Sequence, residues 1–128
     1  MKKKKLGNCF ETANALALTF KARHMDPMIV HALVTHPTEG FRHIHAWVEV
    51  DNLVFDYEYQ VGFVLPRDIY YKAGEIKGGE IRYYTVYEAT EQMLLLGHHG
   101  PWDEDLIFKE FIPEEFATSC KRPSAAGQ

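Results

Sequence analysis

The sequence predicts an α+β domain in which an N-terminal helix packs on an antiparallel sheet. Its 128 residues fit one compact domain. Apolar residues recur at helical spacing near the N-terminus, and two strand-like segments in the middle of the chain are joined by a two-residue turn. The expected order of elements is α-β-β-β-α-β-α.

The N-terminal helix is expected from Cys9 to about Arg23. Asn8 is a good N-cap residue, and Glu11 completes a capping-box pattern with it. The following Asp26–Pro27 pair ends the helix, because a proline cannot continue it. The apolar residues that recur at spacings of three and four are Phe10, Ala13, Leu16, Ala17 and Phe20.

Three strands are expected to follow this helix. Residues 28–35 read as a buried strand. Residues 43–50 and 53–59 form a hairpin, because Asp51 and Asn52 between them are favoured turn residues.

The second half is expected to add two helices and one strand. A short helix begins at residues 65–67 and stops at Gly74, and residues 81–84 form a strand. Thr85 and Glu88 make a second capping box, which opens a helix that ends just before residue 97.

The composition is typical of a soluble globular protein, with 46% hydrophobic and 25% charged residues. The net charge is −4, and the only dense basic run, residues 2–5, reads as a solvated terminus, so no nucleic-acid partner is expected. No apolar stretch could cross a bilayer or act as a secretory signal, which predicts a cytoplasmic protein without a membrane partner. Residues 1–118 are expected to form the single domain, with a short helix around residues 113–117, and residues 119–128 a disordered tail.

Cys9 stands at the start of the predicted helix, whereas the second cysteine, Cys120, lies in the polar tail. The first backbone N–H groups of a helix have no partner within it and form the positive end of its dipole. A thiolate at Cys9 is stabilised there, and the thiolate is the nucleophilic form of cysteine. The same N–H groups could hold the oxyanion of a tetrahedral intermediate, with the Asn8 amide as a further donor.

The hairpin supplies a base and an acid for this thiol. With the predicted turn, Trp47 faces Asp56, and His45 is a diagonal neighbour of Asp56 on the same face. A carboxylate in that place can orient an imidazole. Glu58 lies directly across from His45 and is the rival orienting group, although we prefer Asp56. The opposite face is expected to point to the core and carries Ala46, Val48, Val50, Leu53, Phe55 and Tyr57.

These residues also allow other interpretations. A lone cysteine on a helix is commonly a small packed residue. His43 and His45 form a His-x-His pair beside Asp56, and together with Cys9 they could bind a divalent metal ion. A third possibility is a binding module with the same fold and no turnover.

Two further features have both a functional and a structural interpretation. His98 and His99 lie in an expected loop over residues 97–102, where two glycines and a proline disfavour regular structure. With Trp102 they either line a substrate cleft or belong to a helix end that Trp102 anchors. Trp47 either shields the catalytic pair from water or simply packs in the core.

The second half of the chain is rich in tyrosine. These side chains are expected to pack around the core with their hydroxyl groups outward, or to line a peptide-binding wall. They are Tyr70, Tyr71, Tyr83, Tyr84 and Tyr87.

The Gly-Asn-Cys-Phe segment at residues 7–10, the His-Ala-Trp-Val-Glu segment at residues 45–49 and Asp56 resemble the transglutaminase-like branch of papain-fold cysteine enzymes. The resemblance covers about the first half of the chain and implies a papain-like, transglutaminase-type core. It also implies that Cys9 is the nucleophile, His45 the general base and then acid, and Asp56 the orienting carboxylate.

Over nearly the whole domain, the sequence resembles a group of small, functionally uncharacterised proteins from bacteria and their phages. The leader peptidases of lasso-peptide biosynthesis are similar over the cysteine helix and the His-Ala-Trp strand. The motifs shared with the bacterial and phage group are Gly-Asn-Cys at 7–9, His-Ala-Trp-Val-Glu at 45–49, Pro-Arg-x-x-Tyr-Tyr at 66–71 and Gly-His-x-Gly-Pro-Trp at 97–102.

These resemblances imply a cysteine hydrolase, either a protease or an amidase or deamidase, that acts on a peptide or protein. The thiolate attacks an acyl carbon and forms a thioester, which water resolves. If an amine resolves the thioester instead, the same site performs acyl transfer of the transglutaminase type. The residues do not separate these outcomes, and no cofactor is implied.

Overall fold

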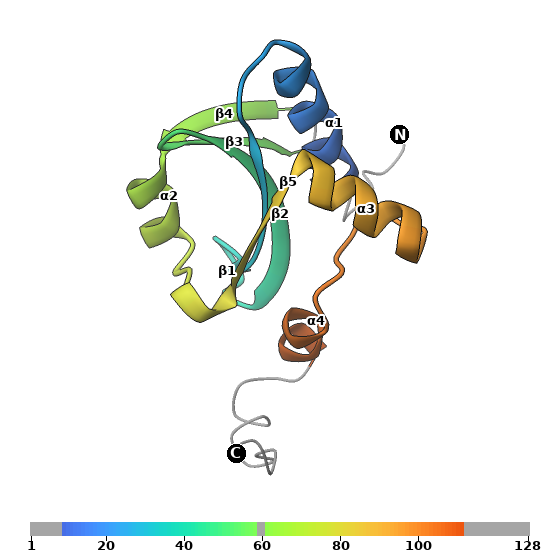
Figure 1. The fold of residues 1–128 in the computed structure, drawn as a ribbon. Helices are drawn as coiled ribbons and strands as arrows, with labels where there is room; N and C mark the ends of the chain where they lie inside the picture. Colours follow the sequence, from blue (N-terminus) through green and yellow to red (C-terminus); the bar gives the residue numbers. More distant parts are fainter. Residues whose placement is uncertain (1–8, 59–60, 112–128) are drawn as a thin grey trace, which may run out of the picture.

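The computed structural model describes residues 9–58 and 61–111. It contains one antiparallel sheet with helices on both faces (Figure 1). The elements in chain order are α1 (Cys9–Ala22), β1 (Met28–Thr35), β2 (Arg42–Val50), β3 (Leu53–Glu58), β4 (Val61–Pro66), α2 (Arg67–Ala73), the 3-10 helix η1 (Gly78–Glu80), β5 (Ile81–Thr85), α3 (Val86–Leu96) and α4 (Glu104–Phe111).

The five strands lie in the order β4-β3-β2-β1-β5, and every neighbouring pair is antiparallel. β1 is paired with β2 along its whole length, and the edge strand β5 pairs with the other side of β1. The structure therefore confirms the predicted α+β class, with an N-terminal helix packed on an antiparallel sheet.

The strand β4 was not predicted. Its sequence contains Gly62 and ends in Pro66, which was expected at the start of a helix, but both residues suit an edge strand. Gly62 pairs with Tyr57 of β3, and a Cβ atom at Gly62 would lie 2.3 Å from a ring carbon of that tyrosine. The tyrosine ring thus occupies the space that a side chain would need, so this strand requires a glycine.

Both faces of the sheet are buried, whereas the sequence predicted one core face. The first face packs against α1, α3 and α4, and the second is covered by α2, which lies on the opposite side of the curved sheet (Figure 1). As predicted, Ala46, Val48 and Val50 belong to the first core. Leu53 and Tyr57, assigned to the same face, are 41% and 48% exposed, so that part of the prediction is wrong.

The capping signals of the second half are confirmed. The Thr85 hydroxyl accepts from the Glu88 backbone N–H, and the Glu88 carboxylate accepts from the Thr85 backbone N–H. Gly97 ends α3 in the left-handed conformation, with φ 81°, where a glycine costs little. The loop at residues 97–102 is irregular, as expected.

The helix α4 was not predicted, because residues 103–111 were expected to be irregular. Its first turn is capped by Asp103, whose carboxylate accepts from the Leu106 backbone N–H at 3.0 Å. Leu106 is fully buried against the first core. One buried leucine is too weak a pattern to predict a helix, although an aspartate before an acidic turn is a usable start signal.

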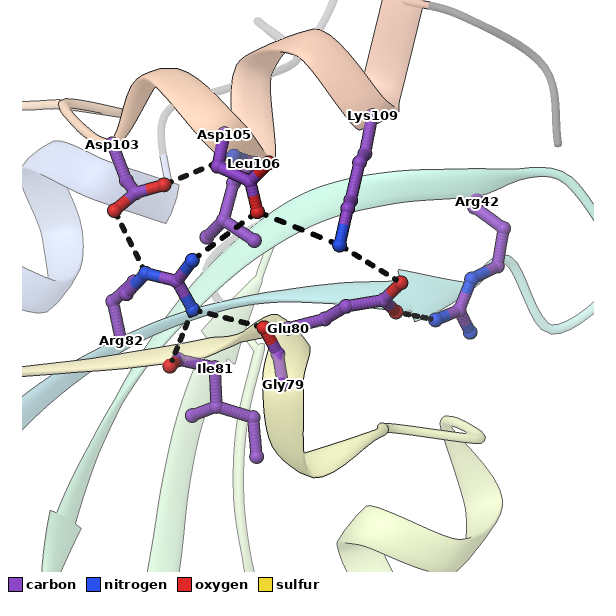
Figure 2. Close-up of polar contacts among 9 residues, drawn as sticks. All are labelled: Arg42, Gly79, Glu80, Ile81, Arg82, Asp103, Asp105, Leu106 and Lys109. Carbon is purple, nitrogen blue, oxygen red and sulfur yellow. Dashed lines mark hydrogen bonds and ion pairs between the residues drawn. The ribbon is translucent and has the colours of Figure 1, made fainter. Parts of the chain in front are cut away.

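Ion pairs connect α4 to the sheet, as Figure 2 shows. Arg82 of β5 donates to Asp103 at 2.7 Å and contacts Asp105 at 3.4 Å. Lys109 lies between Asp105 and Glu80, and Glu80 in turn pairs with Arg42 of β2. Most of these side chains are partly buried, so the network fixes the position of α4 more firmly than isolated surface pairs would.

Several predictions fall on residues that lie outside the described ranges. They are the cap at Asn8, the helix around residues 113–117, the tail at residues 119–128 and the basic run at residues 2–5. Among the residues that the structure does describe, no helix has the length and apolar character needed to cross a membrane.

Candidate active site

His45 and Asp56 form a buried hydrogen-bonded pair on the second face of the sheet. The ring nitrogen Nε2 of His45 lies 3.1 Å and 3.0 Å from the two carboxylate oxygens of Asp56. The His45 side chain, on β2, is 7% exposed, and the Asp56 side chain, on β3, is 3% exposed. The hairpin turn predicted at residues 51–52 is present, and it brings these two side chains together.

The strand register differs from the prediction at one point. Val50 pairs with Leu53 and Val48 with Phe55, as expected. In the described part of the chain, the β2–β3 ladder does not continue to Trp47 and Asp56, although β3 stays paired with β4 there. The two strands therefore separate at the level of the His45–Asp56 pair, which leaves that end of the hairpin free of mutual backbone pairing.

Cys9 is the first residue of α1 and is partly buried against the first core. Hydrogen bonding to Cys9 and the charge of Cys9 are among the causes that raise the pKa of His45, so the thiol lies near that ring. The imidazole is thus hydrogen-bonded to a carboxylate and influenced by a nearby thiol.

This position changes the acid–base properties of the imidazole. Burial alone would lower the pKa of His45, because it disfavours the charged ring. Hydrogen bonds with Asp56 and Cys9, together with the charges of these two groups, outweigh burial and raise the pKa from 6.5 to about 10. A pKa in this range favours the protonated, imidazolium form of the ring at neutral pH.

Tyr70 of α2 is a fourth residue of the candidate site, in a place that the sequence did not predict. Its hydroxyl donates to Oδ2 of Asp56 at 2.5 Å, and its ring packs edge-on against Trp47. The expectation that the tyrosine hydroxyls point outward is therefore wrong at this position. A usable signal existed, because a carboxylate on a buried strand needs hydrogen-bond donors.

A second buried carboxylate, Glu49, lies on the same face of the sheet. It is 2% exposed and accepts from the Trp47 indole, the Arg67 guanidinium and the Tyr71 hydroxyl. The Tyr71 hydroxyl also contacts that of Tyr83 at 2.8 Å. These bonds tie α2 to β2 and β5, and they explain why the last residue of the His-Ala-Trp-Val-Glu segment is an acid.

Trp47 is 1% exposed and lies between the two carboxylate clusters. Its ring centroid is 6.0 Å from that of His45, and its indole N–H donates to Glu49. Both expected roles, packing and shielding of the histidine, are compatible with this position. The side chain of Glu58, the rival orienting acid, lies outside the described residues, whereas Asp56 makes the expected contact.

The loop at residues 97–102 is anchored as a structural unit. Trp102 is buried, and its indole donates to the His98 carbonyl at 2.9 Å. The Asn14 amide of α1 donates to the His99 carbonyl at 3.2 Å. Both histidine side chains are exposed, and the His98 ring accepts from the Gly100 backbone N–H. These contacts support the anchoring interpretation, while substrate contact by the two histidines stays a prediction.

The arrangement around His43 bears on the metal-binding alternative. His43 is half-buried next to His45, with ring centroids 6.0 Å apart. Burial and then the charge of His45 lower the pKa of His43, and a hydrogen bond with the Ile44 backbone opposes this shift. Within the described ranges, no group of three or more His, Cys, Asp or Glu side chains is placed to hold a metal ion. The geometry therefore gives this alternative no support.

Neither the protein-family models, nor the curated proteins, nor the solved structures contained a significant match to the chain. The assignment of the candidate site is therefore based on the geometry of its residues.

Proposed function

We propose that this protein is a cysteine hydrolase that cleaves amide bonds in a peptide or protein, on a papain-like, transglutaminase-type core. Cys9 is the nucleophile, His45 the acid–base group and Asp56 the orienting carboxylate. The observation that carries the proposal is the buried imidazole of His45, which is hydrogen-bonded to Asp56 and whose pKa is raised by both Asp56 and Cys9. Packing alone does not require a thiol, a base and an acid in this order.

The reaction would begin with a thiolate–imidazolium pair. The Cys9 thiolate attacks the acyl carbon, and the oxyanion that forms is held by the unpartnered backbone N–H groups at the start of α1. The His45 imidazolium then donates its proton to the leaving amine as the C–N bond breaks, which leaves a thioester. Neutral His45 removes a proton from water, the hydroxide attacks the thioester, and the acid and the free thiol are released.

The pKa of His45 sets the upper pH limit of this cycle. The imidazolium must still carry its proton when the amine leaves, so activity should fall as the pH approaches about 10. A cysteine with an unperturbed neighbouring histidine would lose that acid near pH 6.5 instead. The pH dependence therefore separates a coupled site from two side chains that merely lie near each other.

Iodoacetamide alkylation tests the first requirement, an activated thiol. The parent protein should carry Cys120→Ala, so that labelling reports Cys9 alone. The second-order rate, measured by intact-mass spectrometry across pH, should be high at neutral and mildly acidic pH and should fall strongly in His45→Gln. Equal rates in the two proteins would contradict the proposed pair.

A peptide library tests the hydrolytic step. The protein and its Cys9→Ala variant are incubated with a proteolytic digest of a cell lysate, and the products are read by mass spectrometry. Cleaved or deamidated peptides that form only with Cys9 present would support the proposal. If no such product forms with an alkylation-competent protein, the assignment as a hydrolase is wrong.

A further inference from the structure

The buried carboxylate of Asp56 receives hydrogen bonds from two directions. His45 approaches both of its oxygens, and the hydroxyl of Tyr70 donates to Oδ2. The carboxylate is 3% exposed, so little water is available to replace either partner. A carboxylate in such a place depends on its donors both for its charge and for its orientation.

The ring of Tyr70 is held in place by other side chains. It packs edge-on against Trp47, with ring centroids 4.9 Å apart and an interplanar angle of 62°. Its ring centroid lies 6.3 Å from that of Phe63 in β4. On the next residue of α2, the hydroxyl of Tyr71 donates to the second buried acid, Glu49. Two adjacent tyrosines of one short helix thus each donate to one buried carboxylate of the sheet.

We propose that Tyr70 is a positioning residue, whose hydroxyl keeps the Asp56 carboxylate turned toward His45. The inference rests on the proposed function, since Tyr70 would orient Asp56, the acid that orients His45 in that proposal. In this scheme Tyr70 acts through Asp56. The active arrangement would then be a chain of four side chains from α1, β2, β3 and α2.

The pair of tyrosines offers a matched test. Tyr70→Phe removes one donor from Asp56, and Tyr71→Phe removes one donor from Glu49, which keeps two others. Both changes keep the aromatic ring, so packing is disturbed equally little. Thermal unfolding followed by circular dichroism verifies that each variant is folded.

The readout is the pH profile of Cys9 alkylation in the Cys120→Ala parent. In Tyr70→Phe the buried Asp56 carboxylate loses a hydrogen-bond donor that fixes its orientation, so it supports the imidazolium less well. The acid limb of the profile should therefore move to higher pH by about one unit, which is roughly a tenfold loss of rate on that limb. The Tyr71→Phe profile should overlay that of the parent.

A double-mutant cycle makes the test specific. In an Asp56→Asn background, Tyr70→Phe should cause no further shift, because the group through which it acts is gone. If Tyr70→Phe and Tyr71→Phe give the same profile while His45→Gln still abolishes activation, the proposed function stands and the positioning role is overturned. If the parent thiol is not activated by His45, the proposed function fails, and this inference fails with it.

Discussion

Mild acid should destabilise this protein through one histidine that lies away from the proposed triad. His31 of β1 is fully buried and packs against the rings of Phe10, Tyr84 and Trp102, with centroids 5.0 to 5.1 Å away. Within the described residues, neither of its ring nitrogens has a hydrogen-bond partner. Burial lowers the pKa of His31 from 6.5 to about 3; the charge of Asp103 opposes this shift, and that of His45 adds to it.

The magnitude follows from the two pKa values. The folded protein excludes a proton that the unfolded chain accepts, so this contribution to stability is complete above pH 6.5 and is lost as the pH falls toward 3. Since one pKa unit corresponds to about 1.4 kcal/mol, the free energy of unfolding should drop by about 2 kcal/mol at pH 5 from this residue alone. That is a large part of the stability of a typical domain.

Urea unfolding of the wild type and of His31→Phe, followed by circular dichroism at pH 7 and pH 5, measures this effect. Any packing strain from the phenylalanine is the same at both pH values and cancels in the difference. The variant should lose about 2 kcal/mol less than the wild type between the two pH values. His24→Asn is a control at an exposed position, where φ is 66° and asparagine is tolerated. Equal losses in the wild type and in His31→Phe would refute the reasoning.

Three further predictions concern the site, the loop and α4. Asp56→Asn should slow turnover by roughly 10²- to 10⁴-fold, because the imidazole loses its orienting charge; steady-state kinetics on a library-derived substrate would measure it. Gly100→Ala should cost about 2 kcal/mol of stability, because φ is 128° and a Cβ would lie 2.8 Å from the His31 ring. Gly78→Ala is the control and should cost little, because its Cβ would have no atom within 4 Å. Urea unfolding of the two variants measures the difference. Arg82→Gln should cost about 1 kcal/mol at low ionic strength and less in molar NaCl, with faster amide exchange confined to α4.

The elements that the sequence predicts well are those with local signals. α1, the β2–β3 hairpin and α3 follow from apolar spacing, a two-residue turn and a capping box, all of which act within a few residues. β4 and α4 lack such signals, because β4 is a strand through its pairing with β3, and α4 is held by ion pairs to β5. Propensity within the segment cannot reveal a partner that lies elsewhere in the chain.

The residues of the candidate site differ in the same way, because local signals predict some of them and not Tyr70. His45 and Asp56 lie on one hairpin, so their contact follows from strand alternation, and the place of Cys9 follows from where the helix begins. Tyr70 reaches Asp56 only because α2 folds over a face of the sheet that was not expected to be buried. Buried acids on strands are the clue to such partners, since each of them must find donors somewhere.

The place of β1 between β2 and β5 has a consequence for synthesis on the ribosome. β1 pairs with β2 almost at once, but its other edge waits for β5, whose Thr85 pairs with Met28. At roughly 5–20 residues per second, that edge stays open for seconds after β2 has emerged. Nascent chains would therefore expose the unpaired edge of an apolar strand during this interval. Chaperone binding or aggregation is then expected before β5 leaves the exit tunnel.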